Sequence, residues 1–332
     1  MAGRRTNLGL LFLLPLAILT GFGAFLVGSG PILLVVGLHA VAGFAILLLL
    51  PWKSMIVRRG LRRPRAGQVT SVPLAVLVVL SLLTGLAHST GLLRDVDGYG
   101  VLGIHVGAAL AAVVPAVLHV RRRRVRPRVT DVSRRSLLRG GALAAAAAGV
   151  YLAMAGAANA LSLPGSRRRD TGSYERSSGD PAGVPATSWL FDAVPAVDRT
   201  AWRLDVLHGD DHQSWTVPAL DAVGDRVTAV LDCTGGWWTE QSWTGARVAR
   251  LLPPGTTGTV TVISATGYRR RLPLTDDLLL ATASGGVRLS PGHGAPLRLV
   301  VPGRRGYHWV KWVVRIEHDD LPWWWQPPLP LQ

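Results

Sequence analysis

Residues 231–252 read LDCTGGWWTEQSWTGARVARLL, and this stretch decides how the second half of the chain is interpreted. The apolar residues that lead into it predict a strand ending at Cys233, and the Thr-Gly-Gly that comes next predicts a turn. A turn there leaves the thiol and the adjoining backbone amides near a cleft. The run SWTGARVARLL predicts one short helix before Pro253. A free cysteine is more often buried and inert than reactive, so its surroundings must decide its role.

The chain from residue 189 onward has the pattern of an α+β domain. Short β-rich runs alternate with Gly and Pro, and they read AWRLDVL, RVTAVLDC, GTVTVISA, LRLVVP and WVKWVVRIE. A segment of about 140 residues can bury a core of its own. Cys233 is the only cysteine, which excludes an internal disulfide framework, a Cys-x-x-Cys redox pair, a covalently attached c-type haem and a cysteine-ligated iron–sulfur cluster.

Two segments of this domain resemble the sulfite oxidase superfamily of molybdopterin-dependent oxidoreductases. In that family, a cysteine followed by glycine turns, Trp-x-Gly and a Leu-Leu helix supplies the thiolate ligand of molybdenum, as in 231–252. The second segment, HGAPLRLVVPGRRGYHWVKWVVRIE at 293–317, resembles the family's pterin-phosphate segment. The resemblance implies Cys233 as the catalytic molybdenum ligand and His293, Arg298 and Lys311 as contacts of the molybdopterin cofactor. Four residues of the same loop either line the cofactor or are exposed loop residues: Arg304, Arg305, Tyr307 and His308.

These residue types suit the implied cofactor. A soft, anionic sulfur fits a metal already held by dithiolene sulfurs, and a phosphate fits a bidentate guanidinium with a point-charge ammonium. The chain departs from sulfite oxidases before the first core strand, where FDAVP at 191–195 replaces their Arg-Asn-His run. The arginine that binds the oxyanion in those enzymes is therefore missing, and sulfite oxidation is in doubt.

The first half of the chain predicts a membrane domain. Four uncharged apolar stretches of about 20 residues lie at 8–28, 31–50, 69–89 and 101–120, each long enough to cross a bilayer. Residues 1–160 hold 18 of the 36 basic residues and only 3 of the 20 acidic ones, whereas the remainder has a net charge of +1. The overall charge of +16 thus belongs to the apolar half, which argues against a soluble nucleic-acid-binding protein.

The connections between these stretches predict their orientation. Residues 51–68 carry six Lys and Arg residues and 121–139 carry nine arginines, whereas 90–100 has Arg94 beside Asp95 and Asp97. The positive-inside rule places the N-terminus and both basic loops in the cytoplasm. The arginines are better explained by topology and contact with anionic headgroups than by a specific ligand.

The four stretches predict a tandem duplication of a helical hairpin. AILTG at 17–21 matches SLLTG at 81–85, and GLH at 37–39 matches GIH at 103–105. The duplication puts His39 and His105 at equivalent positions and at one depth, as for the two ligands of a haem iron. Such a domain resembles the four-helix, bis-histidine membrane cytochromes b, which implies haem b and exchange of electrons with a quinone pool or another membrane carrier.

Two further histidines are weaker haem candidates. His119 follows His105 by nearly four turns on the same helix face, the spacing of ligands for two stacked haems, but Lys53 occupies the equivalent place in the first repeat. His88 lies at the outer end of the third helix. For His88 and His119 a plain interhelical or interfacial hydrogen bond is favoured over haem ligation, whereas ionisable groups inside the bilayer favour haem for His39 and His105.

A second targeting signal is predicted inside the chain. DVSRRSLLRGGALAAAAAGVYLAMAGAANAL at 131–161 resembles a twin-arginine translocation signal, although an arginine pair before a fifth helix could be ordinary positive-inside charge. The route carries folded proteins, as a cofactor inserted in the cytoplasm requires. Ala158-Asn159-Ala160 would fit a signal-peptidase site, so the fifth helix is either retained as an anchor or cleaved. Five crossings from an inside N-terminus place the rest of the chain on the extracytoplasmic side.

The predicted organisation is an all-α transmembrane bundle followed by an α+β molybdopterin-binding domain. The boundaries are 1–130 for the membrane domain, 131–164 for the signal or anchor helix, 165–188 for an exposed Gly-, Ser- and Pro-containing linker and 189–332 for the α+β domain. The function predicted is a molybdopterin-dependent oxidoreductase that transfers an oxygen atom on a small sulfur or nitrogen compound. The alternatives are a non-enzymatic electron-transfer or sensory membrane protein with a degenerate molybdopterin fold and, less favoured, a transporter.

Overall fold

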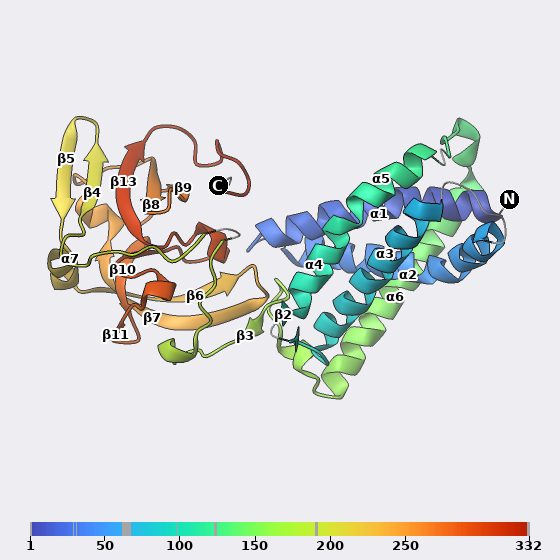
Figure 1. The fold of residues 1–332 in the computed structure, drawn as a ribbon, viewed down its shortest axis with the longest axis horizontal. Helices are drawn as coiled ribbons and strands as arrows, with labels where there is room; N and C mark the ends of the chain where they lie inside the picture. Colours follow the sequence, from blue (N-terminus) through green and yellow to red (C-terminus); the bar gives the residue numbers. More distant parts are fainter. Residues whose placement is uncertain are drawn as a thin grey trace. The chain divides into compact units, whose positions relative to one another are not determined.

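The structure is a computed structural model that describes residues 2–28, 30, 32–61, 68–97, 99–122, 125–189 and 192–330. The chain divides into two compact units, one of Met1–Phe25 with Gly30–Gly172 and one of Leu26–Ser29 with Ser173–Gln332 (Figure 1). We call the first the helical unit and Ser173–Gln332 the C-terminal domain. Arginines 62, 63, 65, 123 and 124 of the predicted basic loops, and Phe191 of the FDAVP run, lie outside the described residues.

Five apolar spans make up most of the described helical unit. They cover Gly3–Leu26, Ile32–Arg58, Ser71–Thr90, Val101–Arg122 and Arg134–Ala160, and each is long and apolar enough to cross a membrane. The four predicted stretches and the fifth helix are therefore helical. The helices are α1 (Ala2–Leu26), α2 (Ile32–Leu61), α3 (Gln68–Thr90), α4 (Val101–Ala111), α5 (Val113–Arg122) and α6 (Arg134–Ala160). The short elements are β1 (Asp95–Val96), β2 (Tyr99–Gly100), η1 (Val129–Asp131) and η2 (Pro164–Arg167).

The fourth span is interrupted at Ala112, between α4 and α5. Pro115 explains the interruption, because it has no N–H to donate to the carbonyl of Ala111, four residues earlier. The helical hydrogen bonds resume at once, since the amide of Ala116 donates to the carbonyl of Ala112 over 3.0 Å. The span is therefore two short helices that follow one another without a loop.

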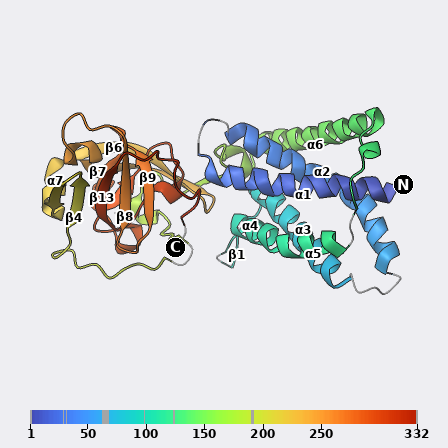
Figure 2. The same ribbon diagram turned by 90° about the horizontal axis from the view of Figure 1, so that it is seen from above.

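Helix α6 packs as a member of the bundle. It runs beside α2 (Figure 2), where Ala147 is fully buried and the rings of Tyr151 and Phe44 lie 6.3 Å apart. The alanine-rich sequence of α6 permits this close approach. Ser133 caps the helix, and its hydroxyl accepts a hydrogen bond from the amide of Ser136 over 3.2 Å.

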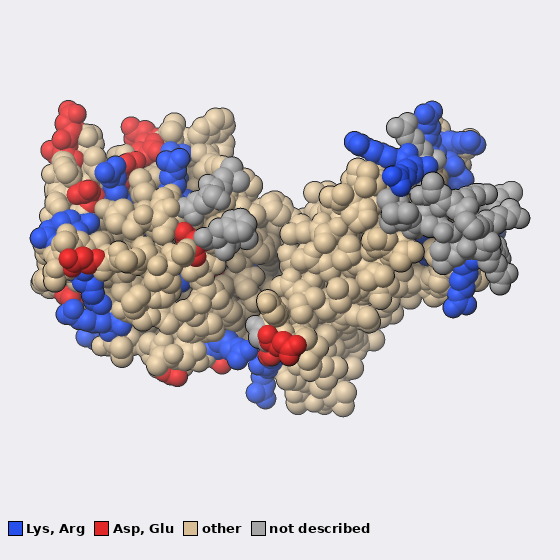
Figure 3. All heavy atoms as spheres, viewed as in Figure 1, with Lys and Arg blue, Asp and Glu red and all other residues tan. Residues whose placement is uncertain are grey.

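Positive charge gathers at one end of the helical unit, and the helix flanks that Figure 3 shows are almost free of it. At that end the guanidinium of Arg4 donates to both carboxylate oxygens of Asp131, over 3.0 and 2.6 Å. This ion pair ties the start of α1 to η1, just before the twin arginines. The N-terminus and the second basic loop thus lie at one end of the bundle, as the predicted topology requires.

The C-terminal domain consists of two β-sheets around one core. A six-stranded sheet contains β3 (Tyr174–Glu175), β6 (Asp225–Cys233), β7 (Trp237–Arg247), β10 (Leu279–Ser284), β11 (Val287–Arg288) and β12 (Arg298–Val300). A five-stranded sheet has the order β5 (Asp211–Trp215), β4 (Leu204–His208), β13 (Val313–Asp319), β8 (Thr259–Ser264) and β9 (Arg269–Pro273). The other elements are α7 (Val217–Val223), η3 (Pro181–Gly183), η4 (Val248–Leu251), η5 (Pro291–His293) and η6 (Gly306–His308).

The helix predicted at 242–252 is wrong. Its first half belongs to β7, the longest strand, which pairs with both β6 and β10, and only η4 follows before Pro253. The reason is the alternation along β7, where Trp237, Thr239, Gln241 and Trp243 are buried and the residues between them are less so. The only α-helix among the described residues of this domain is α7, which Thr216 caps and Gly224 ends in the left-handed region.

The predicted linker at 165–188 is also wrong as a free segment. Ser173 is fully buried, and β3 pairs in parallel with β7, with Tyr174 opposite Trp237. The side chain of Tyr174 is buried, whereas the side chains of a flexible linker would be exposed to solvent. The folded domain therefore begins near Ser173, before the boundary predicted at residue 189.

Candidate functional site

Cys233 ends β6 at the turn into β7, as the sequence predicts. The amide of Gly236 donates to its carbonyl over 3.2 Å, which closes the turn. The sulfur lies 3.3 Å from the amide nitrogen of Gly235, which donates to it, and 3.6 Å from the hydroxyl of Thr187. The thiol is half-buried and surrounded by groups that can donate hydrogen bonds to a thiolate. Thr187, which the sequence analysis missed, comes from the segment predicted to be a linker.

Arg298, on β12, is a buried cation beside the rings of Trp243 and Trp309. Its guanidinium carbon lies 5.5 and 5.7 Å from the two ring centroids, and Nη1 donates to the carbonyl of His293 over 3.3 Å. Its Nε has no hydrogen-bond partner. Burial lowers the pKa of Arg298 to about 10, and the nearby Cys233 opposes that shift.

Lys311 lies in the same cluster. Its ammonium donates to the carbonyls of Thr187 and Gly292, both over 2.6 Å. Burial and the charge of Arg298 lower the pKa of Lys311 to about 7. Within the described residues, neither Lys311 nor Arg298 forms an ion pair with a carboxylate. A buried and a half-buried cation without a counter-ion, next to a cysteine, form a site for an anionic group.

His293 contacts this cluster through its backbone carbonyl, which accepts from Arg298, and its ring is held by two hydrogen bonds of its own. Its Nε2 donates to the carbonyl of Val184 over 2.9 Å, and its Nδ1 lies 2.7 Å from the hydroxyl of Ser290. Burial lowers the pKa of His293, and a neutral ring fits this arrangement. Gly294 follows with φ of 103°, and a Cβ there would come within 3.1 Å of Lys311 and 3.2 Å of Arg298. A glycine is required because the chain passes so closely between the two cations.

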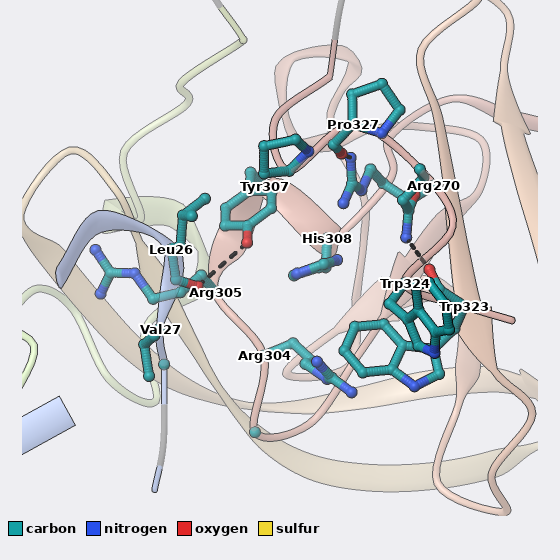
Figure 4. Close-up of a pocket in the computed structure, with 14 residues that line it drawn as sticks. Leu26, Val27, Arg270, Arg304, Arg305, Tyr307, His308, Trp323, Trp324 and Pro327 are labelled. Atoms are coloured by element: carbon teal, nitrogen blue, oxygen red, sulfur yellow. Dashed lines mark hydrogen bonds between the residues drawn. The ribbon is translucent and has the colours of Figure 1, made fainter. Parts of the chain in front are cut away.

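The four loop residues predicted as further cofactor contacts divide into two groups. Arg305 is buried and pairs with Asp232, and its Nη2 donates to the carbonyl of Cys233 over 3.4 Å. Arg305 therefore stabilises the cysteine turn through the backbone carbonyl of Cys233. The other three, Arg304, Tyr307 and His308, line a pocket together with Arg270 and with Arg305 itself (Figure 4).

The helical unit brings His39 and His105 together, as the duplication predicts. Their ring centroids are 5.9 Å apart, with the rings nearly perpendicular. Nδ1 of His39 lies 3.0 Å from the carbonyl of Ala17, and Nδ1 of His105 lies 2.7 Å from the carbonyl of Ser81. Ala17 and Ser81 are themselves equivalent positions of the two repeats. A carbonyl only accepts, so each Nδ1 carries the proton and each Nε2 presents a lone pair.

Two equivalent glycines make room for these rings. A Cβ at Gly21 would lie 3.0 Å from the ring of His39, and one at Gly85 would lie 3.0 Å from the ring of His105. The two repeats thus share the ring, its carbonyl acceptor and the space beside it. The hydrogen bonds that the structure describes for both rings involve Nδ1 alone.

His88 and His119 lie elsewhere. Nε2 of His88 lies 3.0 Å from the carbonyl of Gly172, and Nδ1 of His119 lies 3.1 Å from the hydroxyl of Ser71. The equivalent contact in the first repeat joins Lys53 to Asn7 over 2.9 Å. The described residues contain another close histidine pair, His208 and His318 with ring centroids 4.7 Å apart, but it belongs to the C-terminal domain and includes neither His88 nor His119. No group of three or more metal-binding side chains is found among the described residues. Haem ligation by His88 or His119 thus stays a weak prediction.

Comparison with known proteins assigns the C-terminal domain. Residues 191–323 match the family described as the oxidoreductase molybdopterin binding domain. Nitrate reductase [NADPH] of Mycosarcoma maydis is 56% identical over 43 residues, which are 13% of this chain and 4% of that protein. Nitrate reductase [NADPH] of Phytophthora infestans is 48% identical over 44 residues, again 13% of this chain and 5% of that protein. The matches thus span only a small part of these relatives.

A solved structure gives a further match. The sulfane dehydrogenase SoxCD from Paracoccus pantotrophus is 25% identical with a TM-score of 0.35, over 39% of this chain and 40% of that chain. The family match covers both β-sheets apart from β3, and it contains Cys233, Arg298 and Lys311. The C-terminal domain of this chain is therefore a molybdopterin-binding oxidoreductase domain of the sulfite oxidase type.

Proposed function

We propose that the protein is a membrane-anchored molybdopterin-dependent oxidoreductase that exchanges electrons through a b-type haem of its own helical unit. The proposal is supported by the presence of two sites in one chain. In the first, Cys233 lies beside Arg298 and Lys311, whose positive charges lack a counter-ion. In the second, the rings of His39 and His105 are paired. When bound, the molybdenum cofactor would supply two-electron oxygen-atom transfer and the haem one-electron transfer. The substrate would be a small oxidised sulfur or nitrogen compound.

The residues of the C-terminal domain fit the molybdenum cofactor. Cys233 would ligate the metal, because its sulfur already accepts from the amide of Gly235 and lies near the hydroxyl of Thr187. Arg298 and Lys311 would bind the phosphate of the pterin, which would supply the counter-ion that these two cations lack. The unpartnered Nε of Arg298 is available as a donor for it.

The paired histidines would hold a haem iron through Nε2. Their ring centroids lie 5.9 Å apart, and the hydrogen bonds described for both rings use Nδ1, which leaves Nε2 of each as the ligating atom. A metal-bound histidine usually donates its other nitrogen to a carbonyl or carboxylate, as both rings do here.

The topology proposed has the N-terminus inside and the C-terminal domain outside the cytoplasm. The positive end of the helical unit, with Arg4 and Asp131 in contact, supports this orientation. The burial of Ala147 against α2 supports retention of α6 as an anchor. A cleaved α6 would remove one side of that packing.

The twin-arginine signal is tested by replacing Arg134 and Arg135 with lysines, which keeps the charge but changes the motif. We expect the C-terminal domain to stay inside the cell. Protease access to the domain in spheroplasts measures this, with Arg121 and Arg122 replaced by lysines as the matched control. Normal export of the first variant would mean that the pair is ordinary positive-inside charge.

The titration of Lys311 gives a second check. With a folded-state pKa of about 7 against an ordinary 10.5, the unfolded chain holds this proton between those pH values and the folded chain does not. The cofactor-free protein should therefore gain stability as pH rises from 7 to 9, by up to about 1.4 kcal/mol per pH unit. Bound phosphate should abolish the gain. Thermal midpoints of cofactor-free and loaded protein measure it, and an equal gain in Lys311→Met would assign it to other groups.

The proposed function is tested by electron transfer in the purified, detergent-solubilised chain. A reduced quinone should reduce the haem, and sulfoxides, N-oxides and nitrate are then screened for haem reoxidation. Sulfite is screened for haem reduction from the oxidised protein. A haem that no oxidised or reduced compound affects, in protein that contains molybdenum, would contradict the proposed exchange.

A further inference from the structure

The pocket of Figure 4 is a basic pocket separate from the proposed cofactor site. Arg270 of β9 and His308 of η6 line it and are 3% and 4% exposed, and Arg304 lines it from the loop before η6. In the close-up, the imidazole of His308 lies between the side chains of the two arginines. The lining residues include none of the four that surround the proposed molybdenum and phosphate positions, which are Cys233, Thr187, Arg298 and Lys311. The pocket therefore calls for a ligand of a different kind.

The positive charge of this pocket is not neutralised by the described part of the chain. Nη1 of Arg270 donates to the carbonyl of Pro327 over 3.1 Å, but its Nε has no hydrogen-bond partner. The described lining residues include no Asp or Glu, and no carboxylate that the structure describes pairs with Arg270 or Arg304. Burial, then the charges of these two arginines, lower the pKa of His308 to about 3. A buried cation without a counter-ion is costly, which points to an anionic occupant.

The same pocket contains the end of the first apolar span. Leu26, Val27 and Gly28 line it, and Leu26 is the last residue of α1 and of the span Gly3–Leu26. These three residues belong to the same compact unit as the C-terminal domain, and the hydroxyl of Tyr307 donates to the carbonyl of Leu26 over 3.1 Å. A residue that ends a membrane-spanning helix lies at the boundary between hydrocarbon and headgroups. With α1 in a bilayer, the pocket therefore lies at the depth of the lipid phosphates.

Exposed tryptophans adjoin the pocket in the segment after β13. Trp324 and Trp325 are 61% and 65% exposed, and Trp324 also lines the pocket. The segment is held in place, because the guanidinium of Arg271 donates to the carbonyl of Trp325 and the side-chain amide of Gln326 donates to the carbonyl of Arg271, both over 2.7 Å. An indole combines an apolar body with an N–H donor, and such side chains are enriched at the bilayer interface. These two rings thus suit the same depth as the end of α1.

We infer that this pocket binds the headgroup of an anionic phospholipid at the membrane surface. Arg270 and Arg304 donate charge-assisted hydrogen bonds to the lipid phosphate, and the acyl chains stay in the bilayer beside Leu26. The ring of Trp323 holds the half-buried Arg304 at the pocket, with 4.4 Å from the guanidinium carbon to the ring centroid. The pocket volume of about 380 Å³ is near the lower limit for small-molecule sites, so it accommodates a headgroup rather than a whole lipid. The inference goes beyond the proposed function but rests on the membrane anchoring in it.

The test is titration of the delipidated, detergent-solubilised full chain with short-chain phosphatidylglycerol, phosphatidylcholine and inorganic phosphate, with bound molecules counted by native mass spectrometry. We expect one phosphatidylglycerol per chain to bind more tightly than phosphatidylcholine, which has no net charge, or inorganic phosphate, which has no acyl chains. Arg270→Gln should weaken this binding about tenfold or more, because a hydrogen bond between charged groups is lost. Arg304→Gln should weaken it as well, and its half-buried position guards against misfolding of the first variant.

Arg269→Gln is the matched control, since Arg269 neighbours Arg270 on β9 and is exposed. It should bind the lipid as the unmodified chain does. Phosphatidylglycerol binding that is unchanged in both Arg270→Gln and Arg304→Gln would overturn the inference, and so would inorganic phosphate that binds as tightly as the lipid. Molybdenum and haem are measured in the same samples. A chain that binds the lipid but lacks either cofactor contradicts the proposed function alone, whereas a chain with both cofactors and no such lipid contradicts this inference alone.

Discussion

Replacing Cys233 with alanine should eliminate turnover while leaving the pterin bound. The variant removes one sulfur from the metal's ligands, but Arg298 and Lys311 still provide charge-assisted hydrogen bonds to the phosphate. Cys233→Ser should not restore activity, because a hydroxyl is a harder ligand and ionises far less readily than a thiol. Activity, pterin content and X-ray absorption at the molybdenum edge measure the three expectations.

The alternative for Cys233 is a small core residue. Alanine would then cost about 1 kcal/mol of stability and keep activity. Thr187→Val is an informative companion variant, because it removes the hydroxyl 3.6 Å from the sulfur without touching the ligand itself. Identical sulfur coordination of molybdenum in the original chain and in Cys233→Ala would show that the cysteine is structural.

Replacing either His39 or His105 with alanine should abolish the low-spin haem spectrum. Both rings offer Nε2, because Nδ1 of each donates to a backbone carbonyl, and a variant with one ring would lack one of the two proposed haem ligands. Reduced-minus-oxidised spectra of membranes containing each variant measure the effect. His119→Ala is the matched control, since it lies on the same span and contacts Ser71 instead.

A different outcome would relocate the haem. An unchanged spectrum in His105→Ala would show that His105 is not a haem ligand. Loss of the spectrum in His88→Ala would indicate that His88, near the end of α3, is a ligand. Gly85→Leu offers a variant that leaves both ligands in place. A Cβ at Gly85 would already lie 3.0 Å from the ring of His105, so a larger side chain should shift the ring and alter the spectrum.

The apolar spans of the helical unit were predictable because their signals are local and repeated. Twenty apolar residues in a row specify a span, and the offsets of 64 and 66 residues between the repeats specify equivalent positions. The sequence therefore predicted that His39 and His105 occupy equivalent positions, and that Lys53 is the equivalent of His119. The backbone partners, Ala17 and Ser81, could not be predicted, because no property of an alanine or a serine marks its carbonyl as an acceptor.

The C-terminal domain was less predictable because its pattern depends on pairing with distant strands. The run around Trp243 contains good helix formers, but β6 and β10 lie on both sides of it and impose a strand. Thr187 and Ser173 lie in a polar stretch without periodicity, so nothing local indicated that they contact the cysteine turn. Arg305 was predicted as a candidate cofactor contact, and only the structure shows that Asp232 is its partner.

The proposal that one chain holds both redox centres is tested most directly by the molybdenum and haem content of a single purified preparation. We expect close to one molybdenum and at least one b-type haem per chain, with molybdenum depending on Cys233 and haem on His39 and His105. Haem without molybdenum would indicate an electron-transfer or sensory protein with a degenerate molybdopterin fold. Molybdenum without haem would contradict the electron path through the helical unit.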